Sequence, residues 1–514
     1  MTGFDYVVVG GGAAGCLLAA RLSDDPACRV ALIEAGLGHL SPLHTIPGLA
    51  PFAAKDGRHL WRVVTESENN LAGRQVTLLQ GRVLGGSAAV NGMVYTRGHA
   101  ADYDAWDCPG WTAADVLPWF RPPVATRPSR PQSPLPQRFL LAAEQSGFAL
   151  TDDLNADVVD AFGLTHVTVA NGMRANTRLA LLRPAMAQPN LTVMTNTPVR
   201  RLAFSGTRAC GVVVARDGRE QVIAASREVI LTAGGLRSPH LLMLSGIGPA
   251  AMLRAAGVTV LLDLPGVGRN LQNHPSFPLR YVTTEPVSLA RQARPLAAVG
   301  AALSWLTRRQ GVLAENIFNA AGFVRTDPSL AAPDAQIVMS PVLFPADAAR
   351  GLALLPRRHG VTLAVQQGSP FSRGEVTLAS ADPLAPPRVR TGAFSDPRDV
   401  AVLGRAIRMA RDIMAQPAMA GLRPELPEAE FDTPAALESS IRRLSGSAYH
   451  QSGTCRMGTD AEAVVDHALR VHGVEGLRVA DGSIIPRLMN AALQAPTMMI
   501  AERAAAMITR RNAA

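Results

Sequence analysis

The sequence predicts an α/β fold, α+β overall, that opens with a Rossmann-like unit for binding a dinucleotide. Residues 4–10, FDYVVVG, form a short apolar run that is typical of a buried parallel strand. Residues 13–23 have the composition of a helix, and residues 29–35, RVALIEA, are typical of a second strand. Between the first strand and the helix lies GGGAAG, residues 10–15, which matches the pattern G-x-G-x-x-G. Strand, glycine loop, helix and strand therefore follow the order of a dinucleotide-binding βαβ unit.

Each glycine of this loop has its own physical role. Gly10 allows a tight turn, Gly12 lets the backbone approach a pyrophosphate, and Gly15 lets the helix pack closely on the strand. The phosphates are expected at the helix N-terminus, where free N–H groups and the helix dipole favour negative charge. Glu34 can accept hydrogen bonds from a ribose hydroxyl. The loop alone does not distinguish FAD from NAD, and its predicted contacts are Gly10, Gly12, Ala13, Ala14, Gly15, Glu34 and Ala35.

The rest of the chain shows further elements in outline. Residues 191–234 alternate like strands, and a turn at Asp217-Gly218 joins two of them. Residues 121–137 contain six prolines, which predict an irregular surface connection or lid whose arginines are solvated. The other expected elements are a short helix over 112–120, strands within 361–367, 374–380 and 476–485, and helices near 396–415 and over 496–510.

Composition limits the classes of protein that the chain can be. A length of 514 residues and an apolar content of 47% indicate a globular protein of two to four domain-sized units. No apolar run is long enough to span a bilayer. The net charge of +9 comes almost entirely from arginines spread along the chain, so no nucleic-acid partner is expected.

Five scattered cysteines without a C-x-x-C pair predict neither a metal site nor a disulfide framework. A strand begins at residue 4, which leaves no room for a secretory signal. We therefore expect a cytoplasmic protein with reduced thiols.

Motifs beyond the N-terminus resemble those of one known family. GRVLGGSAAVNGMVYTRG (81–98) and GGLRSPHLLMLSGIG (234–248) are similar to the two signatures of the glucose–methanol–choline (GMC) oxidoreductases. YHQSGTCRMG (449–458), GLRVADGSIIP (476–486) and APTMMIAERAA (495–505) resemble the end of the same family. The resemblance covers nearly the whole chain, in the order of the family.

This resemblance implies FAD as the cofactor and two interleaved domains. The implied chemistry is oxidation of an alcohol to a carbonyl by hydride transfer to flavin N5. The implied partners are a small-molecule substrate and, as electron acceptor, oxygen or another acceptor. The substrate domain is expected to be built on an antiparallel sheet with helices. We expect the FAD-binding domain over residues 1–36, 77–120, 190–285 and 445–514, and the substrate or cap domain with its lid segments over 37–76, 121–189 and 286–444.

The matching positions imply a set of FAD contacts in addition to the N-terminal unit. Val199 matches the valine whose backbone meets adenine, and Asp481 matches a position near the pyrophosphate and the ribityl chain. Relatives with covalent flavin have a histidine just before the asparagine of the first signature, where this chain has Val90, so non-covalent FAD is expected. The remaining implied contacts are Val83, Gly86, Asn91, Gly92, Met93, Val94, Gly482, Gln494, Pro496 and Thr497.

His450 is the candidate catalytic base. It matches the active-site histidine of the family, and a neutral imidazole has a suitable pKa for removing a hydroxyl proton near pH 7. His274, in the family-like segment QNHPSFP, is interpreted as structural, and Cys455 as a packing residue. The histidines interpreted as surface or loop residues are His99, His240, His467 and His472.

The chain departs from the family pattern at three places. Gln494 stands where the family usually has a second His or Asn; it can hold a substrate oxygen or a water but cannot act as a general base. Ala88 replaces the usual Gly, Ser or Thr, and the lost hydroxyl removes at most about 0.5–3 kcal/mol of phosphate binding. The stretch 121–137 is shorter than in the family, which suggests a more open entrance and a bulkier substrate.

Three functions are consistent with these residues. The first is an FAD-dependent alcohol oxidase or dehydrogenase, with His450 and Gln494 as its catalytic residues. The second is a lyase similar to the hydroxynitrile lyases of the family, or a photodecarboxylase on the same scaffold, which the Gln494 departure keeps open. The third is a protein that has lost catalysis, against which the retained His450 argues.

Overall fold

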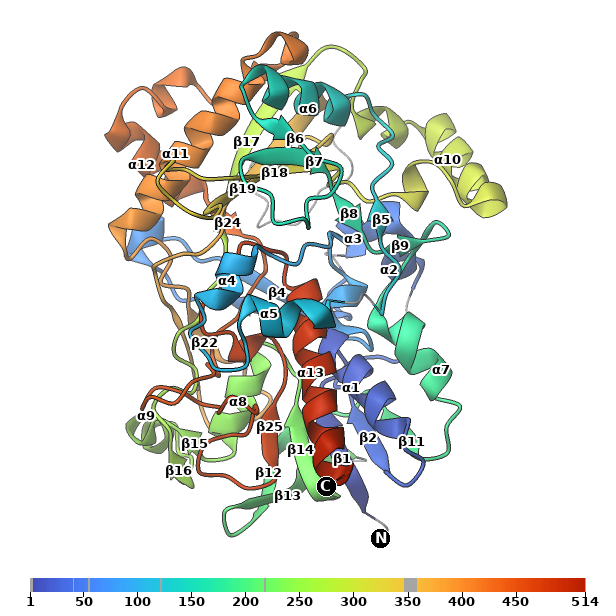
Figure 1. Cartoon of the computed structure of the whole chain (residues 1–514), viewed down its shortest axis with the longest axis vertical. Coiled ribbons are helices and arrows are strands. Elements are labelled where there is room, and N and C mark those ends of the chain that lie inside the picture. Colours follow the sequence, from blue (N-terminus) through green and yellow to red (C-terminus); the bar gives the residue numbers. More distant parts are fainter. Residues whose placement is uncertain are drawn as a thin grey trace.

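The computed structural model describes residues 3–39, 41–53, 56–120, 123–216, 219–345 and 358–513. The molecule is elongated, and each half contains its own β-sheet (Figure 1). The N- and C-terminal ends of the chain lie at the same end of the long axis. None of the described helices is both long and apolar enough to cross a membrane.

The half that contains the chain termini is built on a seven-stranded sheet in the order β11-β2-β1-β14-β13-β12, with β25 paired to β14. The central strand β1 (Phe4–Val9) pairs in parallel with β2 (Val30–Ile33) on one side and β14 (Arg219–Leu231) on the other. The remaining strands are β11 (Leu191–Met194), β12 (Val199–Ser205), β13 (Arg208–Arg216) and β25 (Leu477–Val479). Four consecutive buried residues in β1 reflect a strand that is covered on both faces.

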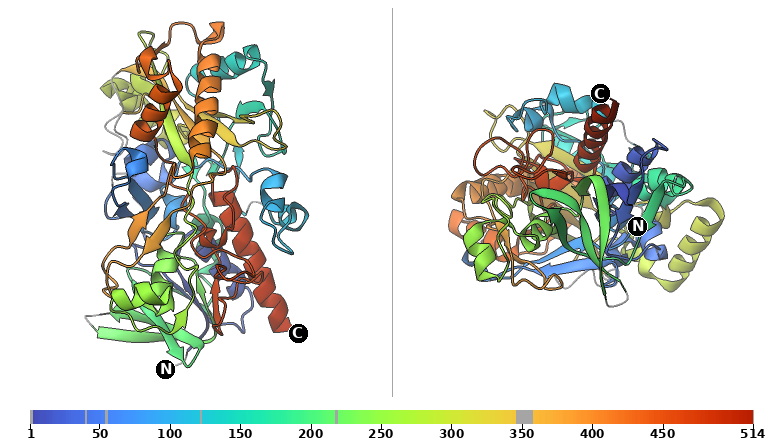
Figure 2. Two further views of the ribbon diagram at one scale, coloured as in Figure 1. Left: turned by 90° about the vertical axis from the view of Figure 1, so that its left-hand side faces the viewer. Right: turned by 90° about the horizontal axis from the view of Figure 1, so that it is seen from below.

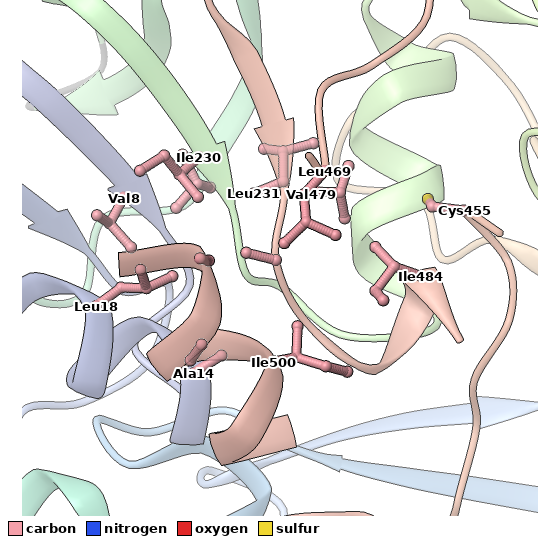
Figure 3. Close-up of a cluster of buried hydrophobic side chains, with 14 of the residues drawn as sticks. Val8, Ala14, Leu18, Ile230, Leu231, Cys455, Leu469, Val479, Ile484 and Ile500 are labelled. Carbon is pink, nitrogen blue, oxygen red and sulfur yellow. The ribbon is translucent and has the colours of Figure 1, made fainter. Parts of the chain in front are cut away.

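Two helices from opposite ends of the sequence pack together against this sheet. Helix α1 (Ala13–Ser23) follows the glycine loop, and α13 (Gln494–Ala513) ends the chain (Figure 1). Their buried side chains meet those of the strands in one apolar cluster that includes Val8, Leu18 and Ile500 (Figure 3). Truncation of a fully buried leucine in such a cluster destabilises a protein by about 2–5 kcal/mol, so this contact holds the two chain ends together.

The second half is built on an eight-stranded sheet in the order β23-β17-β20-β19-β18-β7-β6, with β24 paired to β17. All its pairings are antiparallel except that of β6 with β7. The strands are β6 (Ala149–Leu150), β7 (Ala161–Leu164), β17 (Pro275–Thr283), β18 (Ala320–Val324), β19 (Ala335–Ser340), β20 (His359–Gln367), β23 (Arg423–Pro424) and β24 (Gly446–Ser447).

Three helices cover this second sheet and enclose a separate apolar core. They are α6 (Leu135–Gln145), α11 (Pro397–Met414) and α12 (Pro434–Leu444), and the side view shows them beside the strands (Figure 2). The strongly amphipathic sequence of α11 buries Leu403, Ile407 and Ile413 against the sheet.

Most predicted elements are confirmed. The N-terminal βαβ unit, the helix near 396–415 and the C-terminal helix are all present, and the mixed α/β fold class is correct. The strand predicted over 476–485 is shorter and ends at Val479, because a 3₁₀ turn begins at Gly482. The expectation of an irregular stretch over 121–137 is wrong at two places, because Arg127–Pro128 form the short strand β5 and α6 begins at Leu135. The predicted turn at Asp217-Gly218 lies outside the described residues.

Two segments contact a different core from the one that their predicted domain implies. Strand β17 begins at Pro275 and belongs to the eight-stranded sheet, although the predicted FAD-binding segment runs to residue 285. The hairpin of β21 (Glu375–Thr377) and β22 (Arg388–Arg390) packs Val376 and Val389 into the core of the first half.

Candidate active site

The glycine loop between β1 and α1 has the geometry that its sequence predicts. Gly10 has φ +108°, and a Cβ there would lie 2.6 Å from the carbonyl oxygen of Thr232. A Cβ on Gly15 would lie 1.8 Å from the carbonyl oxygen of Gly10, so only glycine lets α1 approach the loop this closely. A Cβ on Gly12 would meet nothing closer than 3.9 Å, because this residue faces a cavity.

Glu34 closes the other side of this loop. Its two carboxylate oxygens accept hydrogen bonds from the N–H groups of Gly11, at 2.8 Å, and Gly36, at 2.7 Å. Burial raises the pKa of Glu34 to about 7, and the two backbone donors partly oppose this rise. Because each carboxylate oxygen has a second lone pair, Glu34 can still accept hydrogen bonds from ribose hydroxyls.

The cavity has a volume of about 660 Å³ and extends from the glycine loop to the second sheet. Three predicted contact residues, Gly15, Val83 and Pro496, are buried behind its wall rather than in it. The predicted residues that line the cavity are Gly10, Gly12, Ala13, Ala14, Glu34, Ala35, Gly86, Asn91, Gly92, Met93, Val94, Val199, His450, Asp481, Gly482, Gln494 and Thr497.

Asp481 joins three segments at the wall of the cavity. Its carboxylate accepts hydrogen bonds from the N–H of Gly234 at 2.8 Å, the hydroxyl of Ser238 at 2.6 Å and the N–H of Ser483 at 2.7 Å. Asp481 is buried, so these three donors compensate for the loss of water around its charge. It therefore fixes the second signature, 234–248, against the C-terminal segment. Cys455, close to this carboxylate, is fully buried in the apolar cluster as predicted (Figure 3).

His450 lines the cavity, and one of its ring nitrogens is hydrogen-bonded to a second histidine. Its Nδ1 lies 2.8 Å from Nδ1 of His274, and Nε2 of His274 lies 3.0 Å from the carbonyl oxygen of Met489. A carbonyl only accepts, so Nε2 of His274 carries the proton and Nδ1 of a neutral His274 is an acceptor. His450 must then donate through Nδ1, which leaves its Nε2 lone pair free. His274, interpreted from the sequence as structural, thus directly orients the candidate base.

Both imidazoles are neutral near pH 7. Burial lowers the pKa of His274 to about 4. Burial, and then the neighbouring His274, hold the pKa of His450 well below its ordinary value. His450 therefore needs no prior deprotonation to accept a proton.

Gln494, the first residue of α13, is oriented by a second hydrogen-bond chain. The guanidinium of Arg174 donates to Oδ1 of Asn91 at 2.6 Å, and Nδ2 of Asn91 donates to Oε1 of Gln494 at 2.6 Å. Within the described residues, Nε2 of Gln494 has no hydrogen-bond partner. Because Arg174 can only donate, the chain has a fixed direction and leaves the NH₂ group of Gln494, a residue that lines the cavity, as a buried donor without a partner among the described residues.

Sequence reasoning did not find Arg174. It lies in β10 (Met173–Arg174), is 1% exposed, and also donates to the carbonyl oxygens of His44 at 2.8 Å and Ala88 at 3.3 Å. Burial lowers the pKa of Arg174 to about 9. It belongs to no recognised motif, so only the fold identifies it.

Two further arginines at the cavity also escaped the sequence analysis. Arg82 and Arg237 both lie over the ring of Trp61, with guanidinium carbons 4.5 and 4.0 Å from the ring centroid. Arg82 lies in the first signature (81–98) and Arg237 in the second (234–248), so the two signatures could have indicated both residues. The interpretation of His240 as a surface or loop residue is wrong: it is 2% exposed, lies in α8 (Arg237–Leu244) and lines the cavity.

The far end of the cavity is formed by the second sheet and is mostly apolar. Ile317, Phe318, Val338 and Ala364 line it, together with the amides of Gln336 and Gln366. Among the described lining residues the only carboxylates are Glu34 and Asp481, and both already accept backbone N–H groups. This end therefore offers no carboxylate to a substrate.

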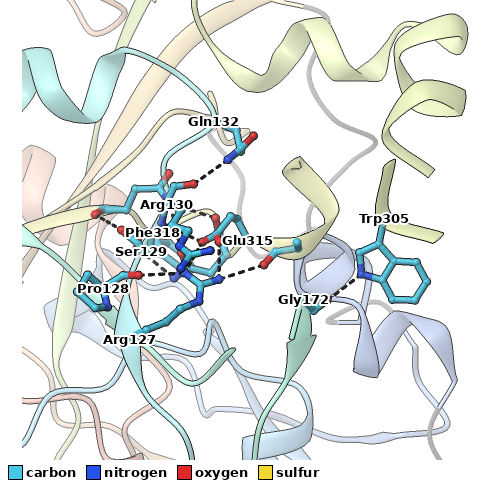
Figure 4. A network of polar contacts seen from close by, with 12 residues as sticks. Arg127, Pro128, Ser129, Arg130, Gln132, Gly172, Trp305, Glu315 and Phe318 are labelled. Carbon is cyan, nitrogen blue, oxygen red and sulfur yellow. Dashed lines mark hydrogen bonds and ion pairs between the residues drawn. The ribbon is translucent and has the colours of Figure 1, made fainter. Parts of the chain in front are cut away.

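The proline-rich stretch is tied to this apolar end. Arg127 forms an ion pair with Glu315, whose carboxylate also accepts the N–H of Arg130 at 3.0 Å (Figure 4). The hydroxyl of Ser129 donates to the carbonyl oxygen of Asn319 at 2.8 Å. These contacts bracket Ile317 and Phe318, so the stretch, although it lies where the sequence predicts a lid, serves to fix part of the cavity wall.

Comparison with known proteins identifies the family. The N-terminal model of the GMC oxidoreductases matches residues 4–276, and the C-terminal model matches residues 370–501. The chain belongs to the GMC oxidoreductase family. Among curated GMC relatives, the oxygen-dependent choline dehydrogenase of Sinorhizobium medicae is 38% identical, covering 98% of this chain and 94% of its own. That of Photobacterium profundum is 37% identical, covering 98% and 92%.

Solved GMC structures have the same fold. Pyridoxine 4-oxidase from Mesorbium loti superposes with a TM-score of 0.89 at 29% identity, and formate oxidase with 0.92 at 25%; each comparison covers 99% of both chains. The cofactor of this protein is FAD, and the protein is an oxidoreductase that acts on alcohol-type donors. These relatives give no support to a lyase or a photodecarboxylase.

Proposed function

We propose that this enzyme oxidises an uncharged alcohol to a carbonyl compound, with His450 as the base and Gln494 as a donor to the substrate oxygen. The observation that carries the proposal is the His450–His274–Met489 chain, which leaves Nε2 of His450 as a free acceptor at the cavity. Gln494 lines the same cavity, and its buried NH₂ group has no partner among the described residues, so we assign it as the donor to the substrate oxygen once the side chain turns toward the substrate.

Each residue has a defined part in the reaction. FAD, when bound, supplies the hydride acceptor. Nε2 of His450 takes the hydroxyl proton, a role that contributes about 10²–10⁴-fold in other enzymes. Gln494 donates to the oxygen as negative charge develops on it. His274 keeps Nδ1 of His450 occupied, so that only Nε2 is available to the substrate.

The predicted FAD contacts that line the cavity remain our assignment for the cofactor. Three features support this assignment: the shape of the glycine loop, the free lone pairs of Glu34, and the hydrogen bonds by which Asp481 joins the second signature to the C-terminal segment. We assign the cofactor-binding domain to the seven-stranded half and the substrate domain to the eight-stranded half. Val90 lines the cavity and has no nucleophilic atom, which supports non-covalent FAD. Denaturation in acid should release all the flavin into the supernatant, whereas flavin that stays with the precipitate would contradict this assignment.

The charge of the cavity argues for an uncharged substrate. The similar choline dehydrogenases are named for a cationic alcohol, yet the described apolar end has no carboxylate to pair with a cation. An unpaired cation buried there would lose several kcal/mol of solvation. We therefore expect kcat/KM for 3,3-dimethylbutan-1-ol, the neutral shape analogue of choline, to exceed that for choline by at least roughly tenfold. A higher kcat/KM for choline would reject this substrate class without affecting the assignment of His450.

The function itself is tested by anaerobic flavin reduction. A panel of primary and secondary alcohols should bleach the flavin of the wild-type holoenzyme, and the His450→Gln variant with the same flavin content should not be bleached at a comparable rate. Admission of oxygen to the reduced enzyme then distinguishes an oxidase from a dehydrogenase. The five free thiols suit a reducing compartment and support a cytoplasmic location, which cell fractionation can test.

A further inference from the structure

Three side chains capable of binding a metal lie close together outside the cavity. His44 is in α2 (Pro42–Thr45), Asp56 lies between α3 (Ala50–Ala53) and β3 (Leu60–Val64), and His59 directly precedes β3. One ligand atom of each side chain lies within 4.8 Å of the other two. The histidines are 0% and 2% exposed, and their ring centroids are 4.3 Å apart.

The hydrogen bonds of this cluster leave one nitrogen of each imidazole without a partner among the described residues. Nδ1 of His59 lies 2.8 Å from Oδ2 of Asp56, so Nδ1 carries the proton and Nε2 keeps its lone pair. Nδ1 of His44 lies 2.9 Å from the hydroxyl of Ser41. Among the described residues, neither Nε2 has a hydrogen-bond partner, although both atoms are buried. Two buried nitrogen atoms without partners are unfavourable unless a further group satisfies them.

We propose that Nε2 of His44 and Nε2 of His59 bind a divalent transition-metal ion, for which Zn²⁺ is the best match. Two imidazoles beside a carboxylate suit Zn²⁺, Ni²⁺ or Cu²⁺, whereas Mg²⁺ and Ca²⁺ prefer oxygen ligands. Asp56 orients His59 through Nδ1 and supplies a negative charge, as carboxylates do behind metal-bound histidines. Water completes the coordination.

The site would stabilise the wall of the cavity and take no part in the reaction. Leu60 and Trp61, next to His59, line the cavity. The carbonyl oxygen of His44 accepts a hydrogen bond from Arg174, the residue that begins the chain to Gln494. A metal ion that joins α2 to β3 would therefore fix both the wall and the backbone contact of Arg174.

Zn²⁺ binding to the tag-free, chelator-treated holoenzyme tests this site. We expect calorimetry with ZnCl₂ and metal analysis after dialysis to give one Zn²⁺ per chain, with an increase in Tm. The double variant His44→Gln/His59→Gln should lose this Zn²⁺ and the Tm increase. His467→Ala, which removes a histidine outside this cluster, should bind Zn²⁺ as the wild type does. Asp56→Asn keeps both ligands and should weaken binding by about 10–100-fold.

Crystals of the wild-type holoenzyme soaked in ZnCl₂ give a second test that does not depend on the variants folding. The proposal predicts an anomalous peak between the two imidazoles. Zn²⁺ found only at other histidines, or Zn²⁺ binding by the double variant with wild-type affinity, would overturn it. Neither result would affect the proposed function, because His450 and Gln494 are outside this cluster.

Discussion

The two groups proposed to act on the substrate are held by hydrogen-bond chains that end differently. The chain behind His450 contains only neutral groups and ends at the backbone carbonyl of Met489. The chain behind Gln494 ends at the buried guanidinium of Arg174, which donates and does not accept. The first chain leaves His450 free to gain and lose a proton, whereas the second fixes a donor that does not titrate. The cavity thus has His450, which titrates, on one side and Gln494, which does not, on the other. We call these two sides the titratable wall and the fixed wall.

The largest expected effect is on the titratable wall. The substitution His450→Gln keeps a polar side chain but removes the proton acceptor, so kcat/KM should fall by roughly 10³-fold. The measurement is steady-state oxidation of the best alcohol of the panel, with flavin absorbance to show that FAD content is unchanged. His467→Gln is the matched control and should keep wild-type activity. A fall of less than tenfold would mean that another group takes the proton.

On the fixed wall, Gln494→Met should remove a donor and keep the side-chain volume. Loss of one donor to developing negative charge lowers kcat by about 10²-fold in other enzymes. Because this donor does not titrate, the pH profile of the variant should have the wild-type shape. A shifted profile would show that Gln494 acts through His450 and that the two walls are not independent.

The pH profile of the wild type follows from the direction of the His450 shift. Its pKa in the folded protein is lowered, and activity requires the neutral form, so activity is lost only as pH falls through that lowered pKa. The ordinary pKa of histidine is 6.5. The kcat/KM should therefore be constant from pH 8 down to pH 6.5 and should decline only below pH 6.5. Assays need excess FAD, because the pKa of Glu34 at the cofactor loop is about 7. An acid limb centred at pH 7 in saturating FAD would contradict a neutral, buried base.

The smallest effect is expected from the positioning residue of the base. His274→Asn keeps a polar partner near Nδ1 of His450. The His450 imidazole would then be displaced but still present, so kcat should fall by only about tenfold. The pKa of His450 should rise, because burial and then His274 lower it, and the acid limb should move to higher pH. A purely structural His274 would reduce the amount of folded enzyme without moving the limb.

Much of the first half could be predicted from sequence because its signals are local. The strand, the glycine loop and α1 are contiguous, and Gly10 and Gly15 are required by backbone geometry that the pattern encodes. His450 was found because it lies in a recognisable segment. The contact of His274 with His450 joins residues 176 positions apart, and nothing local to either residue indicates it.

Arg174 is a clearer example of a residue whose contacts cannot be predicted from its local sequence. Nothing in its neighbourhood distinguishes it from the many surface arginines, yet the fold buries it and connects it to Asn91 and His44. Strand β17 is a related case: only its antiparallel pairing with β20 assigns it to the second sheet, whereas the FAD-binding segment expected from the sequence runs to residue 285. Pairing between distant segments is a property of the whole chain.

The central claim is that His450 presents a bare Nε2 to the cavity while Nδ1 carries the proton. Nitrogen NMR of the holoenzyme labelled at histidine, with the His450 signal assigned by its loss in His450→Gln, reports the protonation of each ring nitrogen directly. We expect a protonated Nδ1 and an unprotonated Nε2 from pH 6.5 to 8. A proton on Nε2 in this range, with Nδ1 bare, would contradict the account.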